Sequence, residues 1–252
     1  MRIIAKLDVK PPNVVKPVHF DGLRKMGSPC KLAQKFYTQG ADEIFYIDIV
    51  ASLYQREVLF DQVAEATKGV FVPFAAGGGV RTLDDMTRLF HSGADKIVLN
   101  TFPLQEDPSL IDRAAHLFGS QSVVIHIDAK QWGSNWECYS DCGREQSGKD
   151  VLEWVQEVQD RGAGEVLLQS VDTDGRQRGF DIELACAVKE HMRVPLVVGS
   201  GAGGIADIKE VAQKVQPDAI AVSSVLHYEI CTVNEIKTAL QLPLGKQEPC
   251  LS

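Results

Sequence analysis

The sequence predicts an α/β protein folded as a single (β/α)8 TIM barrel, and three observations support this class. Its 252 residues are close to the roughly 250 that such a barrel typically needs. Short β-branched segments alternate with amphipathic helical segments along the whole chain, which favours a parallel sheet of right-handed βαβ units. No GxGxxG motif follows the first strand, and eight repeats favour a closed barrel over an open dinucleotide-binding sheet.

The elements follow one another with short connectors. Three helices begin after N-cap signals at Thr82, Asp107 and Asp181. Glycines at positions 40, 93 and 162 lie where helices end. We expect the barrel to span 1–242, followed by a loosely held tail at 243–252. Strands are predicted at 2–8, 43–49, 70–75, 96–100, 122–128, 165–169, 194–198 and 219–223, and helices at 30–39, 57–68, 82–92, 108–118, 150–161, 181–191, 205–214 and 232–240.

The chain also contains an internal half-barrel repeat, with matching segments about 120 residues apart. GADEIFYID at 40–48 resembles GAGEVLLQS at 162–170. LDVK at 7–10 resembles IDAK at 127–130, and the glycine-rich turn at 77–79 matches the one at 199–201. A duplicated half-barrel places equivalent chemistry on opposite sides of one mouth.

Composition excludes several function classes. The net charge of −8 argues against nucleic-acid binding, which depends on Lys and Arg neutralising phosphates. The chain start is not a secretory signal, and no apolar run approaches the ~20 residues that cross a bilayer. The six scattered cysteines favour reduced thiols in a cytoplasmic protein. A metal at Cys138 and Cys142 is the less favoured alternative, and we expect neither a metal nor a cofactor.

Two aspartates are the candidate catalytic residues. Asp8 and Asp128 end the first and fifth predicted strands, which face each other in an eight-stranded ring, and active sites of such barrels lie at these strand ends. Opposed carboxylates can divide general-acid and general-base work if their pKa values differ. Alternatively, each aspartate caps a helix or pairs with the nearby Lys10 or Lys130.

Two glycine-rich turns are candidate phosphate sites, because converging backbone N–H groups bind anions without net basic charge. One combines 77–79 with Asn100 and Thr101, and the other combines 199–203 with 223–224. Asp174 and Gly175 could close the second site. A glycine-rich turn by itself is often only a turn, but the matched pair predicts a substrate with a phosphate at each end.

The motifs resemble a known family over residues 1–241. They are LDVK, NVVK, LRKMGSP, GADEIFYIDI, GGGVR, GADKIVLNT, FGSQSVVIHIDAK, GAGEVLLQSVDTDG, GFDIEL and VLHY, and they resemble the cyclase subunit of imidazole glycerol phosphate synthase. The related histidine-pathway isomerase barrel fits the segments 13–29 and 165–175 less well. The resemblance implies an enzyme that adds ammonia to an open-chain phosphoribulosyl nucleotide, closes the imidazole ring and releases an aminoimidazole carboxamide nucleotide.

The resemblance also implies residue roles. Asp8 would be the general acid and Asp128 the general base. Lys16 would reach over the substrate from the long first loop, although a solvated loop charge is the alternative. Asp48 would be a further substrate-binding residue. The phosphate ligands would be Gly79, Asn100 and Thr101 at one end and Asp174, Gly175, Gly201 and Ser224 at the other.

Four charged residues open strands at the other end of the predicted barrel: Arg2, Glu43, Lys96 and Glu165. Facing inward, they can form a mutually paired ring. This ring is either a stabilising cluster, which often contributes little net stability, or, as the resemblance implies, the gate through which ammonia enters. The second interpretation predicts a glutaminase subunit bound at the N-terminal face of the barrel as a heterodimer.

Several positions depart from the family pattern. Lys6 and His126 precede the two aspartates by two residues, so strand alternation points them inward as well. They are either compensating core pairs or residues that line the ammonia route. Further departures at 11–13, Pro17, Val50 and Ser200 resemble a paralogous branch thought to supply ammonia for acetamidino sugars of surface polysaccharide. A barrel that only binds and activates the glutaminase is a third alternative, disfavoured because both aspartates are present.

Overall fold

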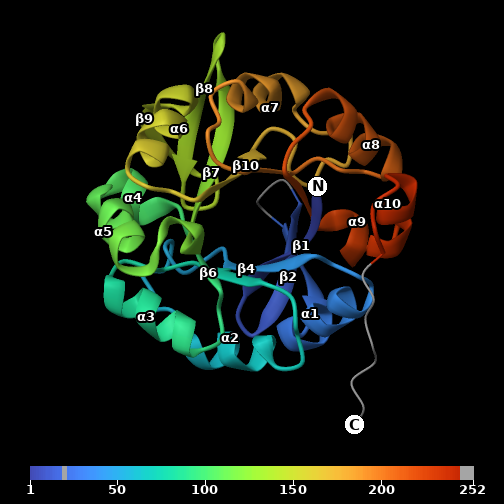
Figure 1. Cartoon of the computed structure of the whole chain (residues 1–252), viewed down its shortest axis with the longest axis horizontal. Coiled ribbons are helices and arrows are strands. Elements are labelled where there is room, and N and C mark those ends of the chain that lie inside the picture. Colours follow the sequence, from blue (N-terminus) through green and yellow to red (C-terminus); the bar gives the residue numbers. More distant parts are fainter. Residues whose placement is uncertain (19–21, 245–252) are drawn as a thin grey trace.

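The computed structural model describes residues 1–18 and 22–244, and its centre is a closed barrel of parallel strands (Figure 1). Each barrel strand pairs with the next, and the last pairs with the first. The predicted (β/α)8 barrel is therefore confirmed. The eight barrel strands are β1 (Arg2–Lys10), β4 (Glu43–Asp48), β5 (Phe74–Gly77), β6 (Lys96–Leu99), β7 (Val123–Trp132), β10 (Glu165–Ser170), β11 (Leu196–Gly199) and β12 (Ala219–Val222).

Helices cover the outside of the barrel (Figure 1). Their apolar faces and the outward side chains of the strands form one large core, with Phe36, Phe74 and Trp154 among its largest buried members. The eight predicted helices are α1 (Pro29–Thr38), α2 (Phe60–Thr67), α3 (Leu83–His91), α5 (Ser109–Phe118), α6 (Val151–Asp160), α7 (Ile182–Lys189), α8 (Ile205–Lys214) and α10 (Val233–Ala239). Three short helices were not predicted: α4 (Thr101–Gln105), η1 (Ser120–Ser122) and α9 (Ser224–His227).

The barrel interior is layered along its axis. Alternate side chains of a strand face the interior, and on β1 these are Arg2, Ile4, Lys6 and Asp8. The charged first residues form the bottom layer, and the polar residues at the strand ends form the top. Between them lies an apolar cluster separate from the outer core; its members are Ile4, Phe45, Ile47, Ala75, Val98, Val124, Leu167, Val197, Ala219 and Ala221.

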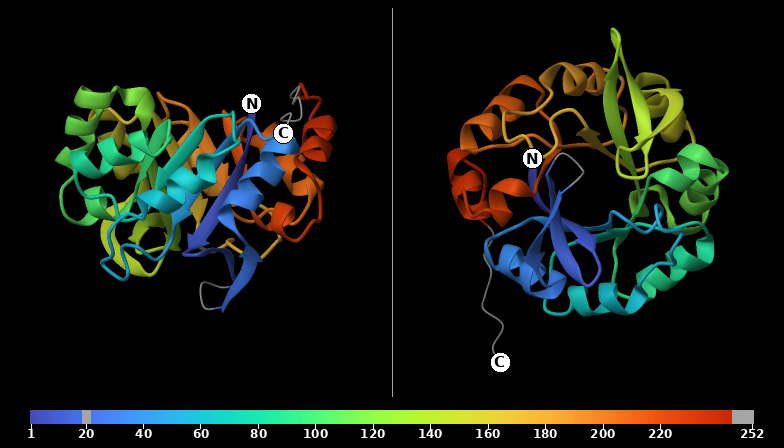
Figure 2. Two further views of the ribbon diagram at one scale, coloured as in Figure 1. Left: turned by 90° about the horizontal axis from the view of Figure 1, so that it is seen from below. Right: turned by 180° about the vertical axis from the view of Figure 1, so that it is seen from behind.

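Two hairpins at the mouth of the barrel were missed by the sequence prediction. β1 and β7 continue past the two aspartates, and each pairs with an antiparallel strand. The first hairpin comprises β2 (Asn13–Val18) and β3 (Gly22–Gly27), and the second adds β8 (Asn135–Ser140) and β9 (Glu145–Asp150). Figure 2 shows the β2–β3 hairpin at the end of the barrel toward which β1 points. The half-barrel repeat therefore extends to these hairpins, which follow the first strand of each half.

Other boundaries differ in detail. The strand predicted at 70–75 begins only at Phe74, because Pro73 has no N–H to donate to a ladder. Thr82 forms a capping box with Asp85, and Asp181 caps α7, as predicted. α5 begins one residue later than predicted, with Pro108 at the N-cap, although the Asp107 carboxylate accepts from the Ser109 N–H at 3.0 Å. The three helix-end glycines have φ between +91° and +100°, as expected.

The predicted tail falls mostly outside the described residues, which end at position 244. In the described part of the chain, no helix is long and apolar enough to span a membrane.

Candidate active site

A cavity of about 410 Å³ opens at the C-terminal mouth of the barrel. A second cavity of about 20 Å³ adjoins it, and both are lined by Ile49, His126, Asp128 and Cys142. The larger cavity lies over the ends of β4 to β7 and against the β8–β9 hairpin. The smaller one reaches toward β1 and β10 and includes Asp8 and Gln169 in its wall. Both predicted catalytic aspartates therefore border the space in which a substrate can bind.

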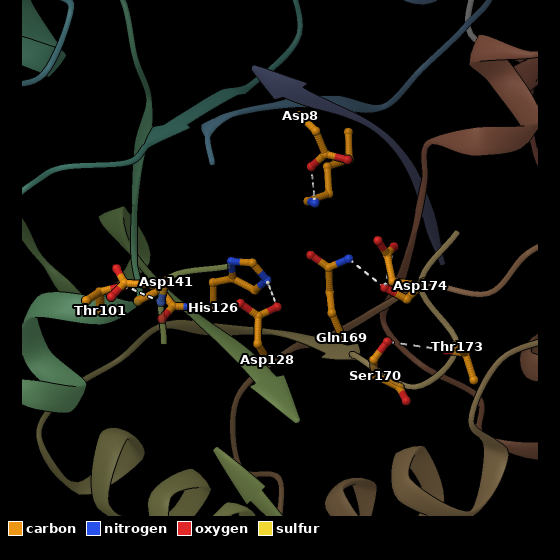
Figure 3. Close-up of polar contacts among 12 residues, drawn as sticks. Asp8, Thr101, His126, Asp128, Asp141, Gln169, Ser170, Thr173 and Asp174 are labelled. Carbon is orange, nitrogen blue, oxygen red and sulfur yellow. Dashed lines mark hydrogen bonds and ion pairs between the residues drawn. The ribbon is translucent and has the colours of Figure 1, made fainter. Parts of the chain in front are cut away.

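Asp128 has two polar neighbours, Asn100 and His126. Its Oδ2 accepts a hydrogen bond from Asn100 Nδ2 at 3.0 Å. Its Oδ1 lies 3.1 Å from His126 Nε2, within ion-pair distance but without the alignment of a hydrogen bond. Figure 3 shows His126 beside Asp128, with Asp8 across the opening. His126 thus faces inward, as strand alternation predicted, and Asn100 orients the carboxylate assigned as the base.

Asp8 has very different surroundings. Lys6 Nζ contacts Oδ1, and Lys16 Nζ donates to Oδ2 at 3.1 Å. Ser223 Oγ lies 3.5 Å from Oδ2. Burial raises the pKa of the Asp8 carboxyl, but the Lys6 and Lys16 ammonium groups outweigh burial and hold the pKa well below its usual range. Asp8 is therefore ionised at neutral pH in this structure. Of the two roles expected for Lys6, the structure shows the first, a buried residue that compensates the charge of its partner.

Lys16 reaches the site from β2 of the first hairpin. It is only 2% exposed and lies 3.5 Å from Asp174 in addition to its bond with Asp8. Burial lowers the pKa of Lys16, but the two carboxylates raise it above its ordinary value. The alternative of a solvated loop charge is therefore wrong, because the hairpin delivers this ammonium into the mouth.

The first predicted phosphate site opens onto the larger cavity. Gly79, Asn100 and Thr101 all line it. Gly79 has φ +77°, and a Cβ there would lie 2.9 Å from the carbonyl oxygen of Arg56, so only glycine fits this turn without strain. Thr101 begins the short helix α4, and a short extra helix is a recurrent phosphate-binding element of these barrels.

Asp48 also lines this cavity, as expected. Arg56 Nη2 donates to Asp48 Oδ2 at 2.7 Å, yet burial outweighs the guanidinium charge and raises the pKa of Asp48. Nη1 of Arg56 is buried and has no hydrogen-bond partner among the described residues. Arg56 is thus a cation beside Asp48 and Gly79 that the sequence prediction missed.

The second predicted phosphate site is closed in this structure. Asp174 lines the smaller cavity, where Ser200 Oγ donates to Asp174 Oδ1 at 3.1 Å and accepts from Gln169 Nε2 at 2.7 Å. Gly175, Gly201 and Ser224 line neither of the two cavities. The structure therefore brings one of the four predicted residues of this site to the cavities.

The four charged residues at the base of the barrel form the predicted ring. Arg2 contacts Glu43 and Glu165, and Lys96 Nζ lies 2.8 Å from a carboxylate oxygen of each. Burial raises the pKa of Glu43, while Lys96 opposes this shift. The apolar cluster separates the ring from the aspartates, so the ring cannot take a direct part in their chemistry.

The β8–β9 turn supplies cavity residues that were not predicted. Asp141, Cys142 and Gly143 have φ of +49°, +61° and +75°, and the Asp141 N–H donates to Thr101 Oγ1 at 3.2 Å. Burial raises the pKa of the Cys142 thiol. No group of three or more His, Cys, Asp or Glu residues in the described ranges could hold a metal ion.

The fold and the site together define an α/β barrel with two opposed carboxylates and a glycine-rich turn at its C-terminal mouth. Residues 2–232 match the model of the histidine biosynthesis protein family, and the chain belongs to that family. It is 43% identical over 239 residues to "Imidazole glycerol phosphate synthase subunit HisF" of Pyrococcus furiosus, covering 95% of this chain and 94% of the relative. Proteins of the same name from Myxococcus xanthus and Helicobacter hepaticus are 42% and 43% identical, covering 95% of this chain and 94% and 95% of the relative.

Proposed function

We propose that this chain is the cyclase subunit of an imidazole glycerol phosphate synthase in histidine biosynthesis. It would combine ammonia with the open-chain phosphoribulosyl nucleotide, close the imidazole ring and release the aminoimidazole carboxamide nucleotide. The relatives that bear the name of this synthase align with this chain over nearly their whole length. The observation that carries the proposal is the pair Asp8 and Asp128, which lie across one mouth and border neighbouring cavities that share lining residues.

Asp128 is the better placed of the two to act as the general base. It faces both cavities, and neither of its two neighbours carries a permanent charge. A carboxylate without a cation on it is free to take a proton from a reacting group. Gly79, Asn100 and Thr101 would hold one phosphate end beside it. Lys16 and Asp174 lie where the other end would bind.

Ammonia would come from a glutaminase subunit bound at the N-terminal face. The ring of Arg2, Glu43, Lys96 and Glu165 lies at this face, on the barrel axis. Both cations share both carboxylates, so the ring can open only if several ion pairs separate together. A docked partner that supplies or removes one charge would therefore control passage into the barrel.

Turnover with ammonium salt tests the cyclase activity without the partner. The purified chain is mixed with the phosphoribulosyl substrate, and loss of substrate absorbance is followed. We expect turnover that Asp128→Asn abolishes. Ring formation that persists in Asp128→Asn would contradict the assignment of the base, and phosphate ligands that fail to bind would contradict an enzymatic role at this mouth.

A second candidate is supply of ammonia to a sugar amidotransferase of surface polysaccharide. The contacts of Lys6 with Asp8 and of His126 with Asp128 favour it, because these two side chains alter the surroundings of both aspartates. Intact phosphate binding without turnover of the histidine-pathway substrate would support this second function. Genes that flank the coding sequence would distinguish the same two alternatives.

A further inference from the structure

Each oxygen of the Asp8 carboxylate is occupied by a lysine ammonium. Lys6 contacts Oδ1 and Lys16 contacts Oδ2. Asp8, Lys6 and Lys16 are 2%, 5% and 2% exposed. The cyclase assignment gives Lys16 a place over the substrate but gives Lys6 no task. A lysine ammonium is costly to bury, so its position on Asp8 calls for an explanation.

The two lysines are anchored to the barrel in different ways. Lys6 lies within β1, where it pairs with Phe45 of β4 in the barrel ladder. Lys16 lies on β2, which joins β1 through the two pairs Val9–Val14 and Lys10–Asn13. A movement of this hairpin would withdraw Lys16 while the barrel stays closed. Lys6 cannot leave Asp8 in this way.

A contacting cation favours the ionised form of a buried carboxyl, and at Asp8, unlike at Asp48, the cations outweigh burial. Separating this cation from an ionised carboxylate costs more free energy in a low-dielectric interior than at the surface, because the Coulomb attraction is less screened there. When Lys16 turns toward a substrate, Lys6 remains on Asp8. Among the described residues, Asp128 contacts His126 and Asn100 but no lysine or arginine, so the two aspartates have different electrostatic surroundings.

We propose that Lys6 is a positioning residue that keeps Asp8 a carboxylate throughout turnover, so that Asp8 orients ammonium groups instead of donating a proton. This revises the general-acid role that the resemblance implies for Asp8, and its kinetic part rests on the proposed function. The other ionisable groups around this pair are Lys16 on β2, His126 and Asp128 on β7, Cys142 in the β8–β9 turn, Asp174 after β10 and His227 on α9.

A carboxyl titration tests the proposal without any turnover. Protein labelled with ¹³C at the aspartate carboxyls is titrated, and the Asp8 signal is assigned by its loss in Asp8→Asn. We expect the wild-type Asp8 signal to stay ionised down to about pH 4, the ordinary pKa of an aspartate. In Lys6→Met its midpoint should rise by about one unit or more, and Lys6→Arg should retain the wild-type curve.

Two results would overturn the proposal. One is a wild-type Asp8 that takes up a proton at or above about pH 4. The other is a Lys6→Met protein whose Asp8 titrates as in the wild type. If Lys6→Met does not fold, a wild-type Asp8 that takes up a proton at or above about pH 4 still overturns the proposal. In Lys16→Met, an Asp8 that stays ionised as in the wild type would support a sufficient role for Lys6, and one that takes up a proton at or above that pH would overturn it.

The pH profile of ammonium-dependent turnover tests the kinetic part. Lys6→Met should lower kcat by about tenfold or more, leave KM nearly unchanged and add an acidic limb, while Lys6→Arg restores the profile. Lys10→Met is the control, since Lys10 lies on the same strand with Nζ 5.9 Å from the Tyr54 ring. An unchanged profile in Lys6→Met would count against the proposal. Absence of turnover in the wild type would contradict the proposed function, whereas the carboxyl titration would still judge Lys6.

Discussion

Asn100 donates a hydrogen bond from its side-chain amide to Oδ2 of Asp128 at 3.0 Å. A residue assigned to phosphate binding therefore also holds the carboxylate assigned to proton transfer. Substitution of Asn100 by Ala would free this carboxylate to rotate.

We expect Asn100→Ala to lower kcat by about ten- to a hundredfold, because a hydrogen bond to a charged group contributes roughly 1.5–3 kcal/mol. Steady-state kinetics with ammonium salt would measure this. Thr101→Val is the matched control, since Thr101 lies in the same cavity wall without contacting Asp128. Its effect should appear mainly in KM. Equal losses of kcat in both variants would contradict a separate role for Asn100.

Gly79→Ala should destabilise the protein and weaken phosphate binding. The residue has φ +77°, and a Cβ would meet the Arg56 carbonyl oxygen and the Ala51 side chain. We expect a loss of about 1–3 kcal/mol in the free energy of unfolding, measured by denaturant titration with and without inorganic phosphate. Gly133→Ala is the control, because Gly133 has φ +62° with open space around it. It should show the smaller backbone cost and unchanged phosphate binding.

Lys96→Met should separate glutamine-dependent from ammonium-dependent turnover. It leaves the buried Glu43 and Glu165 with Arg2 as their remaining partner in the ring. Glutamine-dependent turnover with the partner subunit should fall severalfold, while turnover with ammonium salt should persist. Arg193→Met removes an exposed pair with Asp160 and should change neither rate. Equal effects on the two ammonia sources would argue that the ring is only structural.

His227 makes the protein sensitive to mild acid. Burial lowers the pKa of its imidazole to about 4, although the Asp8 carboxylate and the backbone of Lys6 oppose this shift. On acidification, the imidazole of the unfolded chain therefore binds a proton near the ordinary histidine pKa of about 6.5, which is a higher pH than the folded protein requires. Stability should fall as the pH drops from about 6.5 toward about 4, by up to about 3 kcal/mol.

Denaturant unfolding at a series of pH values would measure this slope, and His227→Gln should flatten it. His116, exposed on α5, provides the comparison variant His116→Gln. The same slope in His227→Gln as in the wild type would show that another group binds the proton.

The sequence was sufficient for the barrel because its strands and helices carry strong local signals. Buried β-branched runs and capped amphipathic helices alternate regularly, and the repeat shows which strands face each other. Lys6 and His126 could be placed inside the barrel by strand alternation alone. The base ring followed from the same argument, since its four members begin their strands.

The hairpins could not be predicted, because β2, β3, β8 and β9 have mixed polar sequences without a clear alternation. Their register depends on the barrel strands that they extend. The burial of Lys16 depends in turn on β2, and the wall formed by Asp141 and Cys142 depends on the β8–β9 turn. The sequence left Lys6 with two possible roles, because strand alternation places a side chain inside the barrel but does not identify its partner.

The two hairpins make the two sides of the mouth different, although the barrel strands of the two halves are similar. The β8–β9 hairpin walls an accessible cavity beside Asp128, whereas β2 places Lys16 between Asp8 and Asp174 on the other side. A molecule long enough to span the mouth would find an open cavity beside Asp128, whereas the Lys16 side chain fills the space between Asp8 and Asp174. The two ends of such a molecule therefore cannot both bind in this conformation, and we expect the end at Asn100 and Thr101 to bind first.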